Sequence, residues 1–312
     1  MSESLPLQSP IDRLVELISL QSTAPDCFTG QSEDIGTPSV FGGQVLAQAL
    51  LAAGRTVPAE RSIHSIHAYF LLPGVHAPIN YSVDRVRDGR SFTTRRVDAS
   101  QDGETIFELL ASFQSPESGV EHQPLMPDVP EPETLRSERE YRLSIADRIP
   151  AHIREKALQP PGIEFRHVNP IDLLNARPRP ATMASWVRAS APLANDPLLH
   201  RALLAYASDH TLLLAATMPH GLSLLRGDVR LTSLDHAMWF HRDFRMDEWL
   251  LYQIESPCTS GARGLCRGQF FDRSGRLVAS TIQEGVVRDQ RRIQTRTASP
   301  SLARAPFILT HS

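Results

Sequence analysis

The sequence has no hydrophobic run long enough to cross a membrane, and it has few cysteines. No stretch approaches the roughly eighteen uncharged apolar residues of a transmembrane helix, and no basic segment followed by an apolar one opens the chain. The three cysteines, Cys27, Cys258 and Cys266, are odd in number and show no C-x-x-C spacing. These absences predict no membrane span, no disulfide framework and no zinc site. We therefore expect a cytoplasmic protein.

The chain also lacks a large charge of either sign. Its 32 Lys and Arg oppose 35 Asp and Glu, which leaves a formal net charge of -3. Such a balance argues against nucleic acid or an anionic membrane as the main partner. The 41% hydrophobic and 21% charged content is typical of a globular protein, and 312 residues are enough for two domains.

No G-x-S-x-G nucleophile elbow is present, although Ser208, Asp209 and His210 are consecutive. Neighbouring residues on a helix point about 100° apart, so this triplet cannot act as a Ser-His-Asp relay by itself. Apolar residues at spacings of three and four predict one helix from Asp196 to Gly221, with Asp209 on its apolar stripe. A carboxylate there costs several kcal/mol unless it has partners. Asp209 must therefore be bound by groups on other elements, for structure or for chemistry.

The first half reads as helices followed by a sheet. Ser9, Pro10 and Asp12 predict the start of a cover helix. Residues 40–53 read as a buried helix with Gly42 and Gly43 in its first turn. Paired glycines there either let a ligand approach the helix N-terminus or allow tight packing. Runs rich in Val, Ile, Phe and Thr, separated by two Asp-Gly turns, then predict an antiparallel meander.

The second half repeats this order of elements. His67-Ala-Tyr-Phe loosely matches His236-Ala-Met-Trp-Phe, and the segment that ends at Gln114 matches the one that ends at Gln283. His67 and Gln114 are 47 residues apart, and so are His236 and Gln283, which indicates a duplicated unit of one helix and one antiparallel sheet. The proline-rich acidic segment between the halves reads as a linker with a short polar helix. The predicted divisions are an N-terminal domain over 1–115, a linker over 116–160, a C-terminal domain over 161–288 and a disordered polar tail over 289–312.

Several separated motifs in one order resemble the acyl-CoA thioesterase II family. They are QSEDIG, VFGGQVLAQAL, HAYFLLPG, RDGRSF, AYASD, LDHAMWFHR, EWLLY, ARG and STIQEGV, which span about residues 30–288. The resemblance implies an α+β double hotdog, in which each half wraps an antiparallel sheet around a central helix. It also implies hydrolysis of acyl-CoA to a free acid and coenzyme A, with acyl-CoA as the partner and with neither a cofactor nor a metal.

The family's catalytic groups correspond to Asp209, Ser233 and Gln283 of this chain. Bacterial members carry Thr at the position of Ser233, whereas peroxisomal relatives carry Ser. We expect Asp209 to orient a water and take its proton, with Ser233 and Gln283 fixing the line of attack. Direct attack by Asp209 to give a mixed anhydride is the alternative. Our candidates for polarising the thioester oxygen are the backbone N–H groups of Gly42 and Gly43.

Other interpretations stay open at this stage. One alternative is a hotdog enoyl-CoA hydratase, although the chain shows no Asp-His dyad at the spacing that we expect for such an enzyme. Another is a non-catalytic acyl-CoA-binding module. His67 and His236 read as core or interface histidines. The arginines on predicted strands either meet coenzyme A phosphates or form a solvated face; they are Arg95, Arg96, Arg263 and Arg267. By analogy with other hotdog proteins we expect a homo-oligomer, either a dimer or a tetramer.

Overall fold

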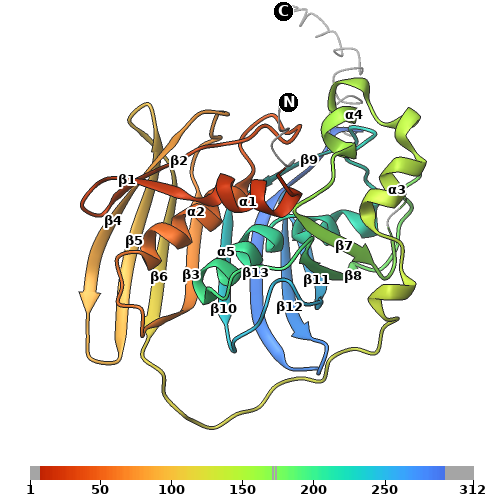
Figure 1. Ribbon diagram of the computed structural model, residues 1–312. Helices are drawn as coiled ribbons and strands as arrows, with labels where there is room; N and C mark the ends of the chain where they lie inside the picture. The colour runs from red at the N-terminus through yellow and green to blue at the C-terminus, as the bar shows by residue number, and fades with distance from the viewer. Residues whose placement is uncertain (1–7, 171, 173, 292–312) are drawn as a thin grey trace, which may run out of the picture.

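The computed structural model describes residues 8–170, 172 and 174–291 (Figure 1). Within them, a 13-stranded antiparallel sheet curves around two central helices, α2 (Gly42–Gly54) and α5 (Pro197–Ser208). The strands are β1 (Leu20–Ala24), β2 (Cys27–Gly30), β3 (Ser62–Phe70), β4 (Ile79–Asp88), β5 (Phe92–Gln101), β6 (Glu104–Gln114), β7 (Ile163–His167), β8 (Thr182–Ala189), β9 (Val229–Ser233), β10 (Asp235–Phe240), β11 (Leu250–Ser260), β12 (Arg263–Asp272) and β13 (Leu277–Asp289). The part of the predicted tail from residue 292 onward lies outside the described residues.

The two halves share one continuous sheet. Its strand order is β1-β2-β4-β5-β6-β3-β10-β13-β12-β11-β8-β7, with β9 paired to β13 off this path. The halves meet where β3 pairs with β10, and His236 lies opposite Ala68 there. The two sheets that the sequence predicts are therefore joined edge to edge.

The predicted caps and turns of the first half are confirmed. Helix α1 (Pro10–Ile18) begins after Ser9, whose hydroxyl accepts the Asp12 N–H at 3.2 Å. The turn between β5 and β6 places Asp102 at φ 49° and Gly103 at φ 85°, which are the positive values that a tight hairpin requires. Strands β1 and β2, which the sequence pattern did not predict, form a hairpin at the edge of the sheet.

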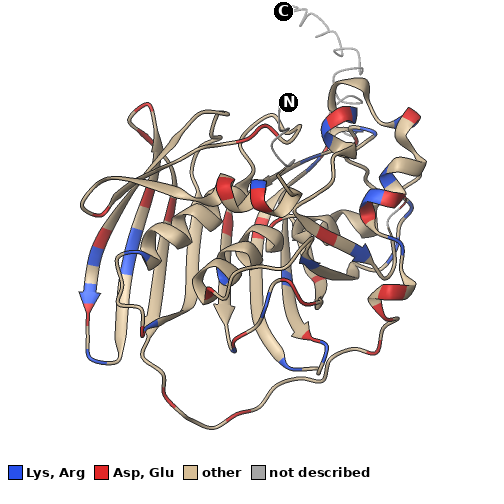
Figure 2. Ribbon diagram, in the orientation of Figure 1, with Lys and Arg blue, Asp and Glu red and all other residues tan. Residues whose placement is uncertain are grey.

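Helices α2 and α5 pack side by side and run antiparallel. Gly42 at the start of α2 lies against Asp209 at the end of α5, and Gly54 at the end of α2 lies against Leu198 in the first turn of α5. Helix α2 contains no charged residue, and Figure 2 shows it without acidic or basic colouring at the centre of the molecule. The apolar faces of the sheet and helices form one core, which explains why this helix has buried residues on all sides.

The predicted helix over residues 196–221 is wrong in its second half. Helix α5 ends at Ser208, Asp209 is its C-cap, and a separate 3-10 helix, η3 (Leu212–His220), follows. The His210 N–H bonds to the Ala207 carbonyl three residues back, which tightens the last turn, and the Tyr252 hydroxyl donates to the Ser208 carbonyl at 2.9 Å. The apolar stripe continues because η3 is also buried, but Asp209 lies at a break rather than inside a helix.

Both halves contain a central helix followed by antiparallel strands, as the duplication predicts. The sequence match between the halves, however, is offset by one residue from the match between their strands. His67 is exposed on β3, whereas His236 is fully buried on β10. Likewise Phe113, not Gln114, is the buried residue at the end of β6, whereas Gln283 itself is buried on β13. A shift of one residue along a strand exchanges its two faces. The polar residues His236 and Gln283 therefore have no polar counterparts in the first half.

The linker packs against the second half. Its elements are η1 (Pro132–Thr134), α3 (Glu138–Ser144), η2 (Ala146–Arg148) and α4 (Ala151–Leu158). A capping box at Ser137 and Glu140 starts α3, and this helix contacts β7. Two short helices thus replace the single one that the composition predicts between Tyr141 and Leu158. None of the helices within the described residues has the length and apolar composition of a membrane span.

Candidate active site

Asp209, Ser233 and Gln283 converge from three elements. The Gln283 Nε2 atom donates to Asp209 Oδ1 at 2.9 Å and to Ser233 Oγ at 2.7 Å, so both of its amide hydrogens are used. The Ser233 hydroxyl completes the triangle by donating to Asp209 Oδ1 at 3.4 Å. Gln283 is 0% exposed, whereas Asp209 and Ser233 are partly accessible. The three side chains that the resemblance implies are therefore in mutual contact.

The second carboxylate oxygen of Asp209 faces the start of α2. A Cβ atom built on Gly42 would lie 2.7 Å from Asp209 Oδ2 and 2.9 Å from Phe70 Cε1. No group in the described part of the chain donates a hydrogen bond to Oδ2. A carboxylate at the C-terminus of its own helix is disfavoured by the α5 dipole, and the positive end of antiparallel α2 opposes this effect. Because Gly42 has no side chain, the carboxylate can lie at that positive end.

Gly43 has a different environment. A Cβ atom there would lie 2.5 Å from the Tyr206 carbonyl oxygen and 2.5 Å from the Phe41 ring. The ring of Phe41 in turn packs edge-on against Tyr206, with centroids 5.0 Å apart. Gly43 thus lets α2 and α5 approach each other, which is the packing role that the sequence left open. Gly42 is the glycine that lies at the carboxylate.

His236 continues the polar network beyond Gln283. Its Nδ1 atom is 2.9 Å from Gln283 Oε1, and its Nε2 atom is 3.0 Å from both Ser208 Oγ and Thr281 Oγ1. Burial lowers the pKa of His236, although the negative charge of Asp209 and the hydrogen bond of Gln283 act in the opposite direction. His236 is therefore a core histidine, as expected, and its ring also joins a network of polar side chains. Its alternation with buried Met238 and Phe240 was the signal that it faces inward.

The consecutive triplet does not act as a unit. Ser208 donates to the Ala205 carbonyl and meets His236, whereas His210 Nε2 lies 3.3 Å from Glu138 Oε2 on linker helix α3. This agrees with the prediction that neighbours along a helix face different partners.

Linker helix α3 holds the turn that follows Asp209. Glu138 contacts His210, Arg142 and, at 3.9 Å, His167, and the Phe165 ring lies 4.7 Å from the His210 ring. Burial raises the pKa of Glu138, but the charges and hydrogen bonds of these partners outweigh it and hold that pKa well below its usual range. In the described part of the chain, no group of three or more His, Cys, Asp or Glu side chains is arranged to hold a metal ion. This cluster connects the linker to the turn that follows Asp209.

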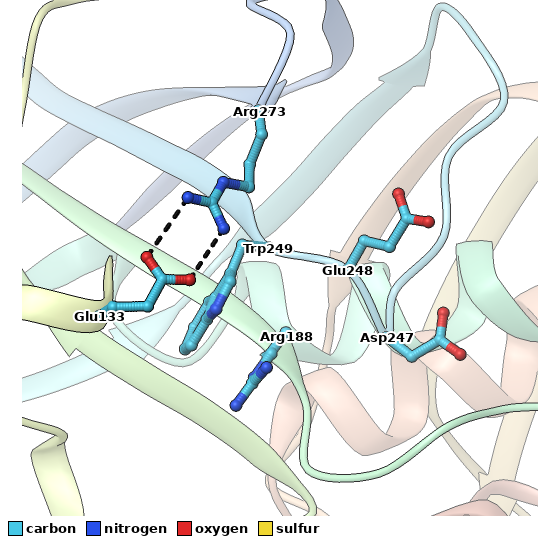
Figure 3. Close-up of a pocket in the computed structure, with 6 residues that line it drawn as sticks. All are labelled: Glu133, Arg188, Asp247, Glu248, Trp249 and Arg273. Carbon is cyan, nitrogen blue, oxygen red and sulfur yellow. Dashed lines mark hydrogen bonds and ion pairs between the residues drawn. The ribbon is translucent and has the colours of Figure 1, made fainter. Parts of the chain in front are cut away.

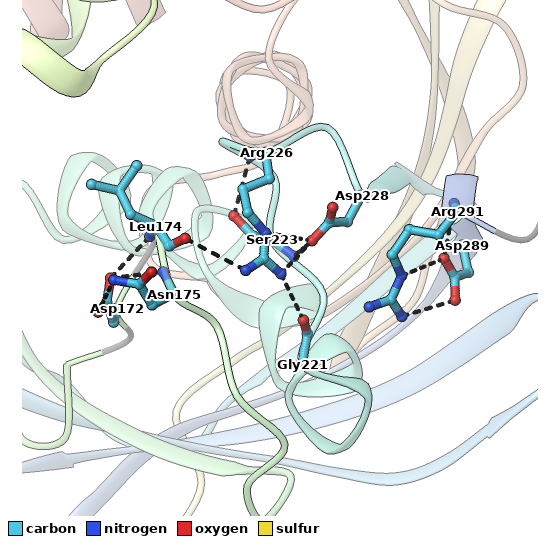
Figure 4. Close-up of polar contacts among 9 residues, drawn as sticks. All are labelled: Asp172, Leu174, Asn175, Gly221, Ser223, Arg226, Asp228, Asp289 and Arg291. Carbon is cyan, nitrogen blue, oxygen red and sulfur yellow. Dashed lines mark hydrogen bonds and ion pairs between the residues drawn. The ribbon is translucent and has the colours of Figure 1, made fainter. Parts of the chain in front are cut away.

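The loop that leads to β9 is braced by Arg226. Its guanidinium bonds to the Gly221 carbonyl at 3.0 Å and to Asp228 at 2.8 Å, and its backbone N–H bonds to the Ser223 hydroxyl at 3.2 Å (Figure 4). These contacts tie the end of η3 to the start of β9. Because Ser233 is the last residue of β9, where it pairs with Gly285 of β13, the brace helps to fix its position.

The strand arginines are occupied by internal partners. Arg95 is 1% exposed and bonds to Thr56 and Asp88, so it is not available to a ligand. The others pair with acids on neighbouring strands; these pairs are Arg96 with Asp84, Arg263 with Glu284 and Arg267 with Glu255. The solvated-face interpretation therefore holds for Arg96, Arg263 and Arg267, whereas buried Arg95 fits neither interpretation.

A separate polar cleft lies at the far end of the second half. It is lined by Glu133, Arg188, Asp247, Glu248, Trp249 and Arg273. Figure 3 shows Arg273 pointing toward Glu133, and the Arg188 guanidinium lies 4.2 Å from the centre of the Trp249 ring. It shares no residue with the Asp209 network, and its Arg273 is already paired with Glu133.

Comparison of the sequence with known families and proteins gives consistent matches. Residues 29–114 match the family described as the acyl-CoA thioesterase N-terminal domain, and residues 177–286 match the family described as acyl-CoA thioesterase. The chain is 40% identical over 281 residues to acyl-CoA thioesterase 2 of Haemophilus influenzae, covering 89% of this chain and 98% of that protein. It is 37% identical to acyl-coenzyme A thioesterase 8 of Homo sapiens, covering 87% of this chain and 88% of that protein.

Solved structures of similar proteins agree with these family matches. The acyl-CoA thioesterase II TesB2 from Mycobacterium marinum has a TM-score of 0.71 at 40% identity, covering 88% of this chain and 97% of that chain. A protein with a hot dog fold from Alicyclobacillus acidocaldarius has a TM-score of 0.72 at 20% identity, covering 88% of this chain and 98% of that chain. These likenesses confirm the predicted α+β double hotdog.

Proposed function

Because this chain belongs to the acyl-CoA thioesterase family, we propose that its hydrolysis of acyl-CoA thioesters takes place at Asp209, with Ser233 and Gln283 as partners. The observation that supports this site most strongly is the triangle of hydrogen bonds in which Gln283 joins Ser233 and Asp209. A buried amide and a hydroxyl that both reach one oxygen of a carboxylate leave its other oxygen free for chemistry.

In the proposed mechanism a water binds between Asp209 Oδ2 and the thioester carbonyl. Oδ2 takes a proton from the water while the water oxygen attacks the carbonyl carbon. The tetrahedral intermediate then collapses, the C–S bond breaks, and the departing thiolate recovers the proton from Asp209. The products are a carboxylic acid and coenzyme A, and Asp209 returns to its ionised form.

The oxyanion requires donors on the other side of the carbonyl. We propose that the first-turn N–H groups of α2, those of Gly42 and Gly43, serve this role, because the first N–H groups of a helix lack partners within it. Their support is the contact of Gly42 with the Asp209 carboxylate. The positive end of α2 favours negative charge on the intermediate as well.

The activated-water mechanism competes with direct attack by Asp209, which would form a mixed anhydride. A single turnover in oxygen-18 water separates them. The activated water requires label only in the released acid, a result that an anhydride opened at its acyl carbon would also give. Label found in Asp209 after proteolysis and mass spectrometry contradicts it.

The central test is release of free thiol from a panel of acyl-CoA chain lengths by wild type, Asp209→Asn and Asp128→Asn. Removal of a general base lowers kcat by about a hundredfold or more. Asp128 is exposed on the linker, so its substitution controls for loss of one charge. If Asp209→Asn folds and keeps wild-type kcat, the proposed site is wrong. If the wild type binds acyl-CoA without releasing thiol, a binding module replaces the enzyme.

We also propose a homo-oligomer, either a dimer or a tetramer, that acts in the cytoplasm on fatty acyl-CoA. Outward-facing Tyr69 and Leu110, which are 62% and 46% exposed on adjacent strands β3 and β6, support association through the sheet. Light scattering after size exclusion tests the assembly, since a mass of 34.6 kDa would indicate a monomer.

A further inference from the structure

The proposed site requires one particular orientation of the Gln283 amide. An amide has a donor end and an acceptor end of nearly equal shape, and only one orientation presents the NH₂ group to Asp209. In the opposite orientation Oε1 would lie at the place of Nε2, which is 2.9 Å from Asp209 Oδ1. Two acceptor oxygens at that distance repel each other. Something must therefore hold the Gln283 amide in one orientation.

The partner at the other end of this amide is His236. Its Nδ1 atom lies 2.9 Å from Gln283 Oε1, and in the described part of the chain it is the one group that bonds to that oxygen. Gln283 and His236 are both 0% exposed, so solvent offers no replacement. A buried acceptor without a donor costs about 1–3 kcal/mol, which is enough to favour rotation of the amide.

We propose that His236 is a positioning residue whose Nδ1–H bonds to Gln283 Oε1 and thereby directs the Gln283 amino group at Asp209 and Ser233. The ring is neutral, with its proton on Nδ1. Its Nε2 atom then accepts from one of two hydroxyls, each 3.0 Å away. That hydroxyl turns its single proton away from a backbone carbonyl, which is that of Ala205 for Ser208 and that of Ala237 for Thr281. Burial, which lowers the pKa of His236, favours this neutral form. The inference rests on the proposed function, because it assigns His236 an effect that passes through Gln283.

Two substitutions separate positioning from packing. In His236→Asn the side-chain amide nitrogen replaces Nδ1, so a donor to Gln283 remains. In His236→Gln the amide lies near the place of Nε2, so contact with the two hydroxyls remains and the donor to Gln283 is lost. We expect His236→Gln to lower kcat by about 10- to 100-fold with little change in KM, and His236→Asn to recover most of that loss. Equal losses in both variants would indicate packing alone and overturn the proposal.

A double-mutant cycle with Gln283→Ala tests whether the effect of His236 on kcat passes through Gln283. If His236 acts through Gln283, His236→Gln has no further effect on kcat once Gln283 is Ala. Additive losses overturn the positioning role while leaving the proposed function intact. If Gln283→Ala alone keeps wild-type kcat, Gln283 is not part of the machinery, and both the proposed site and this inference fail.

A measurement on the wild type does not depend on how the variants fold. Nitrogen-15 chemical shifts of the histidine rings distinguish the two neutral tautomers. We expect His236 at neutral pH to carry its proton on Nδ1, and an Nε2-protonated ring would overturn the proposal. The signal is assigned by its absence from His236→Asn.

Discussion

Gly42→Ala adds one methyl group at the edge of the proposed site, and its effect follows from geometry. The new Cβ atom would lie 2.7 Å from Asp209 Oδ2 and 2.9 Å from the Phe70 ring. Since ordinary contact begins at 3.4 Å, the carboxylate oxygen must retreat by about 0.7 Å, and a displacement near 1 Å at a reacting group costs about a hundredfold in rate. We therefore expect kcat to fall by about two orders of magnitude, which is about 2.7 kcal/mol of barrier.

The loss in this variant comes from displacement rather than from a weaker helix or a missing donor. Alanine is the better helix former by about 1 kcal/mol in a helix interior, and it keeps the backbone N–H. Thiol release under saturating acyl-CoA measures kcat, and urea denaturation checks that the fold is retained. Gly119→Ala is the matched control, because a Cβ atom on Gly119 meets nothing within 4 Å. If Gly42→Ala turned over within about threefold of wild type, the inferred contact between α2 and the reacting carboxylate would be refuted.

Three other predictions concern the surroundings of Asp209. Ser233→Ala should lower kcat by about 10- to 100-fold through loss of a hydrogen bond to a charged group, whereas Ser233→Thr should stay within about tenfold of wild type in the same thiol assay. Glu138→Gln removes the charge that holds His210 and Arg142, and we expect the free energy of unfolding in urea to fall by about 1.5–3 kcal/mol; an unchanged midpoint would contradict this. Burial lowers the pKa of His236 below its ordinary value of 6.5, so the unfolded chain binds more protons than the folded one once the pH falls below that value. Wild-type stability should therefore fall between about pH 7 and pH 5, and His236→Asn should reduce this dependence; identical profiles would contradict the assignment.

The sequence predicts helix α2, the hairpin turns and the succession of strands that follows α2 along the chain, because these depend on local patterns. The Asp102-Gly103 turn takes positive φ, and the alternation of β13 brings Gln283 to the buried face. The end of α5 could not be predicted in this way. Its termination depends on the Tyr252 hydroxyl and on the packing of η3, both of which involve contacts distant in sequence.

Within the site, family motifs located Asp209, Ser233 and Gln283, while their partners depended on register. The letter match equated outward-facing His67 with inward-facing His236, and a shift of one residue on a strand is invisible to spacing alone. The contact of Gly42 with Asp209 and that of Glu138 with His210 join segments far apart in the chain. Neither contact has a signature in the sequence of either partner.

The antiparallel packing of α2 and α5 divides the proposed site between the two halves of the chain. The second half supplies the acid, the hydroxyl and the amide, while the first half supplies the helix N-terminus against which the acid lies. On its own inner face, strand β6 carries Leu109, Ala111 and Phe113 in place of a polar network. In the proposed site the first half thus serves as the electrostatic support of the second. One chain then holds one reaction centre, with its chemistry divided between two diverged copies of the same unit.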